Sequence, residues 1–184
     1  MKKILVVCAM LLSACSSTEP QSSPTPTPSI QDCSRINLAN ESATGDKALP
    51  DVEIECLQGS QSLNVSRLRG PMLIPVWASW CGPCSREMPI FQQFYMMHQD
   101  KVNVLGVALQ DTEYQAIGGA FNWGVTFPSL EDPDGAYRGF LQVQAPPTTL
   151  FVDENGEVVY RKVGEILNLE ELEQLVTEYL KVTL

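Results

Sequence analysis

The segment Trp80-Cys81-Gly82-Pro83-Cys84 places two cysteines two residues apart, after an apolar run and at the start of a predicted helix. Two thiols at this spacing can close to a disulfide and reopen. Backbone N–H groups and the helix dipole stabilise a thiolate at a helix N-terminus, and the thiolate is the nucleophile in disulfide exchange. The motif therefore predicts a redox-active pair in which the first cysteine attacks a partner and the second resolves the mixed disulfide.

A zinc half-site is the alternative interpretation of this motif. Such a site needs a second pair of ligands, but the chain has a single histidine, His98, and its other cysteines are scattered singly. The redox interpretation is therefore favoured, and we expect neither a metal nor another cofactor. His98 comes late in the predicted helix and is expected at the surface.

The first 14 residues have the features of an export signal. Lys2 and Lys3 form a short basic region, and residues 4–12 are apolar but too few to span a membrane comfortably. Leu12-Ser13-Ala14-Cys15 resembles the bacterial lipobox. The resemblance implies that Cys15 becomes the lipidated first residue of the mature protein and anchors it to the membrane surface. An ordinary secretory signal, with Cys15 incidental, is the alternative.

Residues 15–32 are expected to form a tether, because this Ser/Thr/Pro-rich composition cannot bury a core. The folded domain is predicted over residues 33–184. Cleavage after residue 14 would remove two of the 12 basic residues of the full chain and none of its 22 acidic residues. This acidic balance argues against nucleic acid as a partner and against electrostatic docking on anionic lipid.

The cysteines after Cys15 are even in number, as is usual for an exported chain. Cys8 would leave with the signal and Cys15 would carry lipid. The two cysteines of the motif must pair with each other to work, which leaves Cys33 and Cys56 for a structural disulfide. Two alternatives stay open: one of them is a buried free thiol, or one exchanges with the active pair.

Hydrophobic patterning predicts an α/β fold. The order is strand, helix, strand, helix, then a hairpin and a final helix, which requires parallel strands in the first half and an antiparallel edge in the second. This order resembles the thioredoxin arrangement with an early hairpin and a middle insertion. The predicted strands are 49–57, 71–78, 102–109, 148–153 and 157–163, with a short strand and turn over 60–69. The predicted helices are 81–99, 113–123, 136–141 and 167–180.

Two separate motifs resemble those of one family. Residues 76–84, followed by Glu87 and Pro89, resemble the active-site segment of TlpA/ResA-like extracytoplasmic thioredoxins. Residues 145–153, with Gly156, resemble their later signature, in which a cis-proline precedes Thr-Thr and a hairpin. The resemblance covers about residues 48–180 and implies a thioredoxin-like fold with an N-terminal β-hairpin extension and a central insertion.

The resemblance also implies roles for individual residues. Pro147 would be the cis-proline that faces the cysteine pair, and Trp80, Pro146 and Thr148 would join it in contacting the substrate. Pro146 departs from the family pattern, because it cannot offer the backbone N–H that members use to bind substrate main chain.

A second departure concerns proton transfer. Thioredoxins carry a buried aspartate six residues before the first cysteine, and here that position is Pro75. Glu87, one helical turn after Cys84, is the candidate that the resemblance offers as proton acceptor. The alternative is an ordinary glutamate that faces solvent.

Together these features predict a lipid-anchored extracytoplasmic thiol-disulfide oxidoreductase, which we expect to be a monomer. Its partners would be protein thiols and disulfides, apocytochrome cysteines among the family's clients, and a membrane protein that supplies reducing equivalents. The Gly-Pro dipeptide between the cysteines favours a reductase over a disulfide donor. A peroxiredoxin-like peroxidase and a non-enzymatic binding lipoprotein are further alternatives.

Overall fold

The central sheet is built around β3 (Met72–Trp77), whose six residues are all buried. The computed structural model describes residues 29–184, so the predicted export signal, Cys15 and most of the predicted tether lie outside the described residues. Parallel neighbours of β3 are β4 (Asn103–Val104) and β5 (Gly106–Leu109). The strand order is β6-β5-β3-β7-β8, where β6 is Ser129–Asp132, β7 is Thr148–Val152 and β8 is Val158–Val163.

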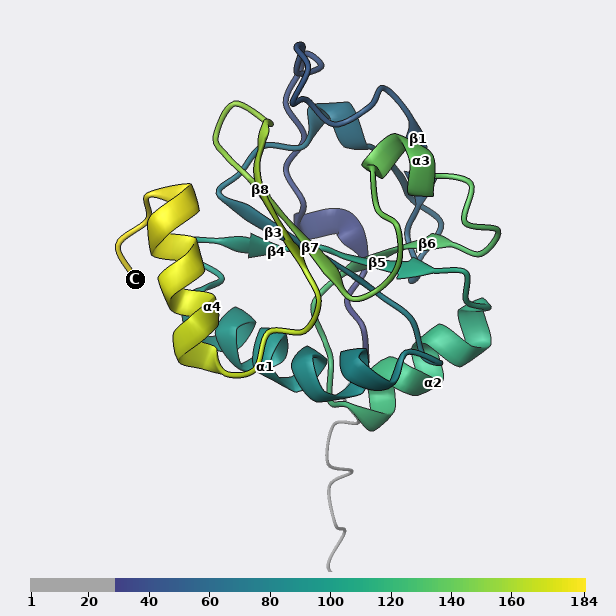
Figure 1. Cartoon of the computed structure of the whole chain (residues 1–184). Helices are drawn as coiled ribbons and strands as arrows, with labels where there is room; N and C mark the ends of the chain where they lie inside the picture. The colour runs from purple at the N-terminus through teal and green to yellow at the C-terminus, as the bar shows by residue number, and fades with distance from the viewer. Residues whose placement is uncertain (1–28) are drawn as a thin grey trace, which may run out of the picture.

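Both faces of the sheet are covered, as the continuous apolar run predicted. Leu73 and Trp77 of β3 pack among helices α1 (Gly82–His98), α2 (Glu113–Asn122) and α4 (Leu169–Leu175). Ile74 and Val76 point to the opposite face, where the N-terminal segment and α3 (Arg138–Leu141) lie (Figure 1). The alternation of strand side chains thus divides the core into two layers.

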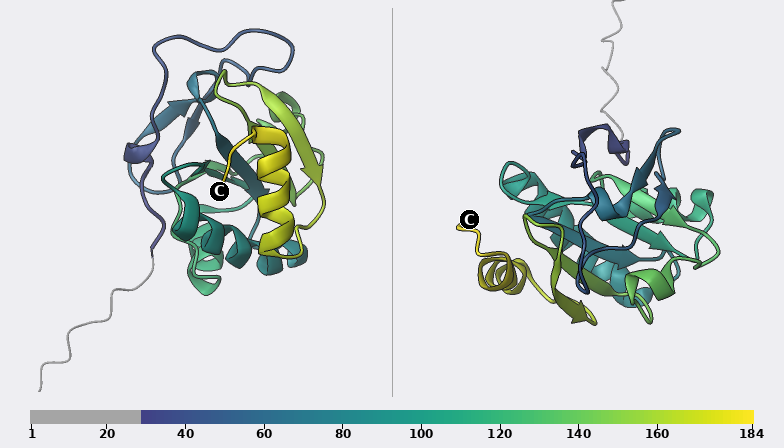
Figure 2. Two further views of the ribbon diagram at one scale, coloured as in Figure 1. Left: turned by 90° about the vertical axis from the view of Figure 1, so that its left-hand side faces the viewer. Right: turned by 90° about the horizontal axis from the view of Figure 1, so that it is seen from above.

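The strand directions agree with the thioredoxin-like fold that the sequence predicted. β3, β5 and β6 run parallel, whereas β7 is antiparallel to both β3 and β8. The early hairpin pairs β1 (Glu53–Glu55) with β2 (Ser62–Asn64) as a separate two-stranded sheet. Figure 2 shows this N-terminal part beside the main sheet, on the side away from the C-terminal helix.

A disulfide joins Cys33 to Cys56. Cys33 opens the 3-10 turn η1 (Cys33–Arg35), and Cys56 follows β1 and bridges to Leu130 of β6. The chain between them packs over the second core layer, so the disulfide closes a loop that covers one face of the sheet.

Replacing both Cys33 and Cys56 by alanine is expected to lower the free energy of unfolding by about 3 kcal/mol, because the unfolded chain regains the entropy of a loop with a sequence separation of 23. Urea denaturation of the oxidised proteins measures this loss. With reductant present, the parent protein should lose stability and the difference should disappear. Equal stability of the two oxidised proteins would contradict the expectation.

Several element boundaries differ from the sequence predictions. The predicted strand 102–109 is divided into β4 and β5, and the predicted helix 167–180 is α4 followed by the π-helical turn η3 (Val176–Leu180). Strand β6 was not predicted, because its four residues include three polar ones. Ile30, predicted to lie in the tether, is buried in the core.

Candidate active site

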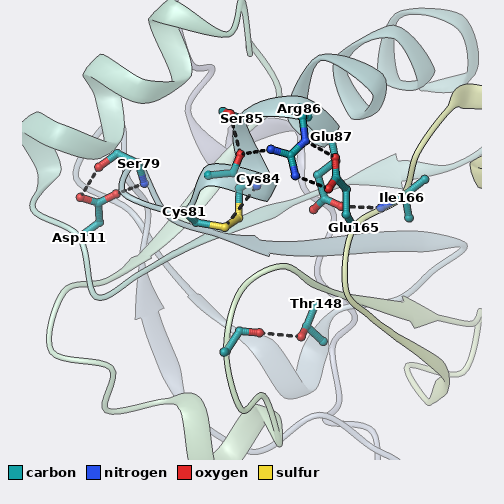
Figure 3. The surroundings of a disulfide bond; sticks show 12 residues. Ser79, Cys81, Cys84, Ser85, Arg86, Glu87, Asp111, Thr148, Glu165 and Ile166 are labelled. Atoms are coloured by element: carbon teal, nitrogen blue, oxygen red, sulfur yellow. Dashed lines mark hydrogen bonds and ion pairs between the residues drawn. A yellow bond between two sulfur atoms is a disulfide. The ribbon is translucent and has the colours of Figure 1, made fainter.

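The cysteine pair lies where β3 passes into α1 (Figure 3). Cys81 is the N-cap of the helix, and the backbone N–H of Cys84 donates to its Sγ at 3.2 Å. Pro83 lies in the first helical turn, where N–H groups have no helical acceptor. The two cysteines are joined as a disulfide, and Cys84 is the more deeply buried of the two. The first thiol is thus the one closer to solvent and to the helix N-terminus.

The buried Asp111 holds the loop that leads into the motif. Its carboxylate accepts hydrogen bonds from the backbone N–H and the hydroxyl of Ser79, the latter at 2.9 Å (Figure 3). Asp111 is the second residue after β5, and β5 runs parallel to β3, so both strands end at the same edge of the sheet. Asp111 was not among the predicted site residues, although a carboxylate shortly after a predicted buried strand was the available signal.

Trp80 is exposed beside the disulfide. The side chain is 58% exposed, and its Nε1 donates to the carbonyl oxygen of Gln110 at 2.9 Å. Gln110 adopts a positive φ of 51° directly before Asp111. One edge of the indole is therefore anchored while much of its apolar surface faces solvent.

An apolar groove of about 760 Å³ opens on the other side of Ser79. Its walls come from α2 and from the first described residues, and they include Ile30, Ile117 and Phe121. The groove therefore places apolar surface beside Ser79, two residues before Cys81.

Glu87 is buried on the active-site helix, three residues after Cys84 and on the same side of it. Only 1% of the residue is exposed, so the solvent-facing alternative is excluded. Its Oε2 accepts a hydrogen bond from the N–H of Ile166 at 2.9 Å (Figure 3). Among the described residues, its Oε1 has no hydrogen-bond partner.

This environment raises the pKa of Glu87 from its ordinary 4.5 to about 7. Burial is the largest cause, because it disfavours the charged carboxylate. The hydrogen bond from Ile166 opposes the increase, the negative charges of Glu165 and Glu171 add to it, and Lys162 opposes it. The carboxyl can therefore gain or lose a proton near neutral pH.

The Pro146–Pro147 peptide bond is cis. In the antiparallel pairing of β3 with β7, Val76 lies opposite Thr148, so the start of β7 reaches the edge of the sheet that carries the motif. The hydroxyl of Thr148 donates to the carbonyl oxygen of Ala145 at 2.8 Å, which holds this loop (Figure 3). Pro146 is partly exposed and Pro147 is buried.

His98 is half-buried rather than exposed at the surface as expected. Its side chain is 12% exposed, its Nε2 lies 3.0 Å from Glu173 of α4, and its ring packs on Phe94. The sequence could not show this contact, because it arises where α4 packs along α1. Within residues 29–184, no group of three His, Cys, Asp or Glu side chains is arranged to hold a metal ion.

Comparison with known proteins gives one family. The model of the Redoxin family matches residues 43–176. The thiol-disulfide oxidoreductase ResA of Oceanobacillus iheyensis is 31% identical over 119 residues, which cover 62% of this chain and 62% of the relative. The thiol:disulfide interchange protein DsbE homolog of Paracoccus denitrificans is 33% identical over 129 residues, covering 68% of this chain and 70% of the relative.

Solved structures agree with these matches. MTB DsbF superposes with a TM-score of 0.63 at 27% identity, covering 70% of this chain and 95% of that structure. A putative thiol:disulfide interchange protein DsbE from Chlorobium tepidum superposes with a TM-score of 0.63 at 25% identity, covering 76% and 97%. The fold, the paired cysteines at a helix N-terminus and these similarities lead to one conclusion. The chain belongs to the redoxin family and is a thioredoxin-like thiol-disulfide oxidoreductase of the ResA and DsbE kind, with Cys81 and Cys84 as its Cys-x-x-Cys pair.

Proposed function

We propose that this protein reduces disulfides of exported proteins while anchored to the outer face of the cell membrane through a lipid on Cys15. The observation that carries the proposal is the Cys81–Cys84 pair at the start of α1, with the buried carboxyl of Glu87 one turn further along the helix. One helix and its N-cap thus carry a nucleophile, a resolving thiol and a group that exchanges protons near pH 7.

The reaction would begin with the reduced pair. The Cys81 thiolate attacks one sulfur of the partner disulfide, forms a mixed disulfide and releases the other partner sulfur as a thiolate. Cys84 then gives up its proton and attacks the Cys81 sulfur, which releases the second partner thiolate. The partner gains two electrons, and the cysteine pair loses two as it closes to the disulfide seen in the structure.

Glu87 would accept the proton of Cys84 during resolution. Pro75 occupies the position of the aspartate that does this in thioredoxins, and it has no titratable group. A general base works best when its pKa is close to the working pH, and burial brings the pKa of Glu87 to about 7.

Partner contacts would be made mostly by apolar surface. Pro146 and Pro147 have no N–H, and the carbonyl oxygen of Ala145 already accepts from Thr148. Main-chain hydrogen bonds at this loop are therefore fewer than usual, and the exposed face of Trp80 is the apolar surface next to the disulfide. The family resemblance adds apocytochrome cysteines as one class of client.

Two features support the proposed anchor and compartment. The lipobox-like residues 12–15 support lipid attachment, and the Cys33–Cys56 disulfide is of the kind that persists in oxidising compartments. Within residues 29–184, no helix is long and apolar enough to cross a membrane. A membrane protein that delivers reducing equivalents is the partner required to return the Cys81–Cys84 pair to the dithiol.

The reduction potential of the pair tests the direction of electron flow. The protein is equilibrated with glutathione or dithiothreitol, and its free thiols are then trapped. Thioredoxin has a reduction potential of about −270 mV and a strong disulfide donor one of about −120 mV. We expect the potential of the Cys81–Cys84 pair to lie closer to that of thioredoxin. The Cys81→Ser/Cys84→Ser protein, which retains Cys33 and Cys56, shows how much signal the structural disulfide contributes. A value near about −120 mV would instead support the second candidate, a disulfide donor to exported proteins.

A further inference from the structure

A bidentate ion pair joins the active-site helix to the segment after β8. Nε and Nη2 of Arg86 donate to the two carboxylate oxygens of Glu165 at 2.8 and 2.6 Å (Figure 3). Two parallel charged hydrogen bonds fix orientation as well as distance. The Arg86 side chain is 63% exposed and that of Glu165 18%, so the ion pair contributes little to overall stability. What the pair provides is a fixed position of Glu165 relative to α1.

The segment held by this pair, Gly164-Glu165-Ile166, also contacts two parts of the active site. The N–H of Ile166 donates to the carboxyl of Glu87 at 2.9 Å, and the N–H of Gly164 donates to the carbonyl oxygen of Pro147 at 3.0 Å. Gly164 has a φ of +90°, which residues with a side chain rarely adopt. One short segment therefore touches the buried carboxyl, the cis-proline loop and the exposed Arg86.

We propose that Arg86 is a positioning residue, whose ion pair with Glu165 holds the 164–166 segment in place and thereby sets the protonation of Glu87. Arg86 and Glu87 are neighbours on α1, and Glu165 and Ile166 are neighbours on the segment, so the ion pair and the buried hydrogen bond lie side by side. A small displacement of the segment would withdraw its N–H from Glu87 while the carboxyl stays buried, so the carboxylate would lose the hydrogen bond that favours its charged form.

Other charges around Glu87 must be separated from this effect. Glu165 faces it from the segment, Lys162 from β8 and Glu171 from α4, with Lys162 and Glu171 3.5 Å apart. If charge alone mattered, removing the positive charge of Arg86 would raise the pKa of Glu87, and removing the negative charge of Glu165 would lower it. If the position of the segment matters, both substitutions loosen the segment and both raise the pKa of Glu87.

The test is a carbon-13 NMR titration of the Glu87 carboxyl in the oxidised protein, where the cysteine pair does not titrate. Arg86→Gln and Glu165→Gln are each expected to move the midpoint upward by about half a pH unit or more, since losing a hydrogen bond to a charged group shifts a pKa by about one unit. Arg86→Lys keeps the charge without the two parallel bonds and should fall between Arg86→Gln and the parent.

Glu170→Gln is the matched control, because it removes one exposed negative charge from α4 without touching the segment. It should leave the midpoint within about 0.2 pH unit of the parent, since exposed charges are well screened. A downward shift, or no shift, in Glu165→Gln would overturn the proposal. The consequence for exchange rests on the proposed role of Glu87. If the midpoints move but the pH profile of exchange does not, the positioning role stands and the proton-transfer role fails.

Discussion

Replacing Cys81 by serine is expected to abolish catalysed disulfide exchange, with the rate falling by about three orders of magnitude or more. A serine hydroxyl cannot form the sulfur–sulfur bond on which the reaction depends, and Cys84 is fully buried and cannot replace Cys81 as the attacking group. The measurement is the rate at which the reduced protein reduces a model protein disulfide, compared with the small-molecule reductant alone.

Cys84→Ser is the matched variant, because it keeps the attacking thiol and removes the resolving one. It should form the mixed disulfide with the model substrate but release it slowly, so that a covalent complex accumulates and can be counted by mass spectrometry. The structural disulfide of Cys33 and Cys56 is unchanged in both variants. Undiminished exchange by Cys81→Ser would disprove the assigned order of attack.

Glu87→Gln is expected to slow exchange near pH 7 by about 100-fold, because general acid–base catalysis typically contributes that much or more. Glutamine keeps an oxygen that accepts from the N–H of Ile166 but cannot take the proton of Cys84. The pH profile of the rate should lose its inflection near pH 7, where the pKa of Glu87 lies. An inflection retained at that pH would assign it to another group.

The same variant should become more stable relative to the parent as the pH rises. In the parent, the folded state holds the Glu87 proton up to a pH of about 7, whereas the unfolded chain releases it near 4.5. Between these values the folded state binds more protons, so raising the pH destabilises the parent by about 3 kcal/mol in total. Glutamine does not titrate, so the stability difference between the two proteins should change by about that amount between pH 4 and pH 8.

Urea denaturation of both oxidised proteins at several pH values measures this difference. Glu154→Gln, in the exposed turn between β7 and β8, provides a control with the same loss of one carboxyl. Lower activity together with a stability advantage at high pH is the combination that distinguishes a functional buried carboxyl from a structural one. A variant that loses activity and is less stable at every pH would indicate a structural role for Glu87.

The redox motif and the order of strands and helices were predictable because their signals are local. Two cysteines at a fixed spacing, an apolar run of six residues and a Pro-Thr-Thr strand are each contained within one short segment. Such periodicity and spacing are properties of neighbouring residues, and the sheet topology follows from the order of the elements. Strand β6 escaped prediction because two of its polar residues, Ser129 and Asp132, are buried only through contacts with distant parts of the chain.

The environment of each active-site group, by contrast, depends on contacts between residues far apart in sequence. Glu87 meets Ile166 across 79 residues, and Ser79 meets Asp111 across 32. The sequence did not determine whether Glu87 faces solvent or the core, because one turn of a helix does not reveal what packs against it. The chain thus specifies by itself the nucleophile and the fold that presents it. Burial, and with it the raised pKa of the neighbouring carboxyl, exists only once distant parts of the chain pack against α1, because desolvation is a property of the assembled structure.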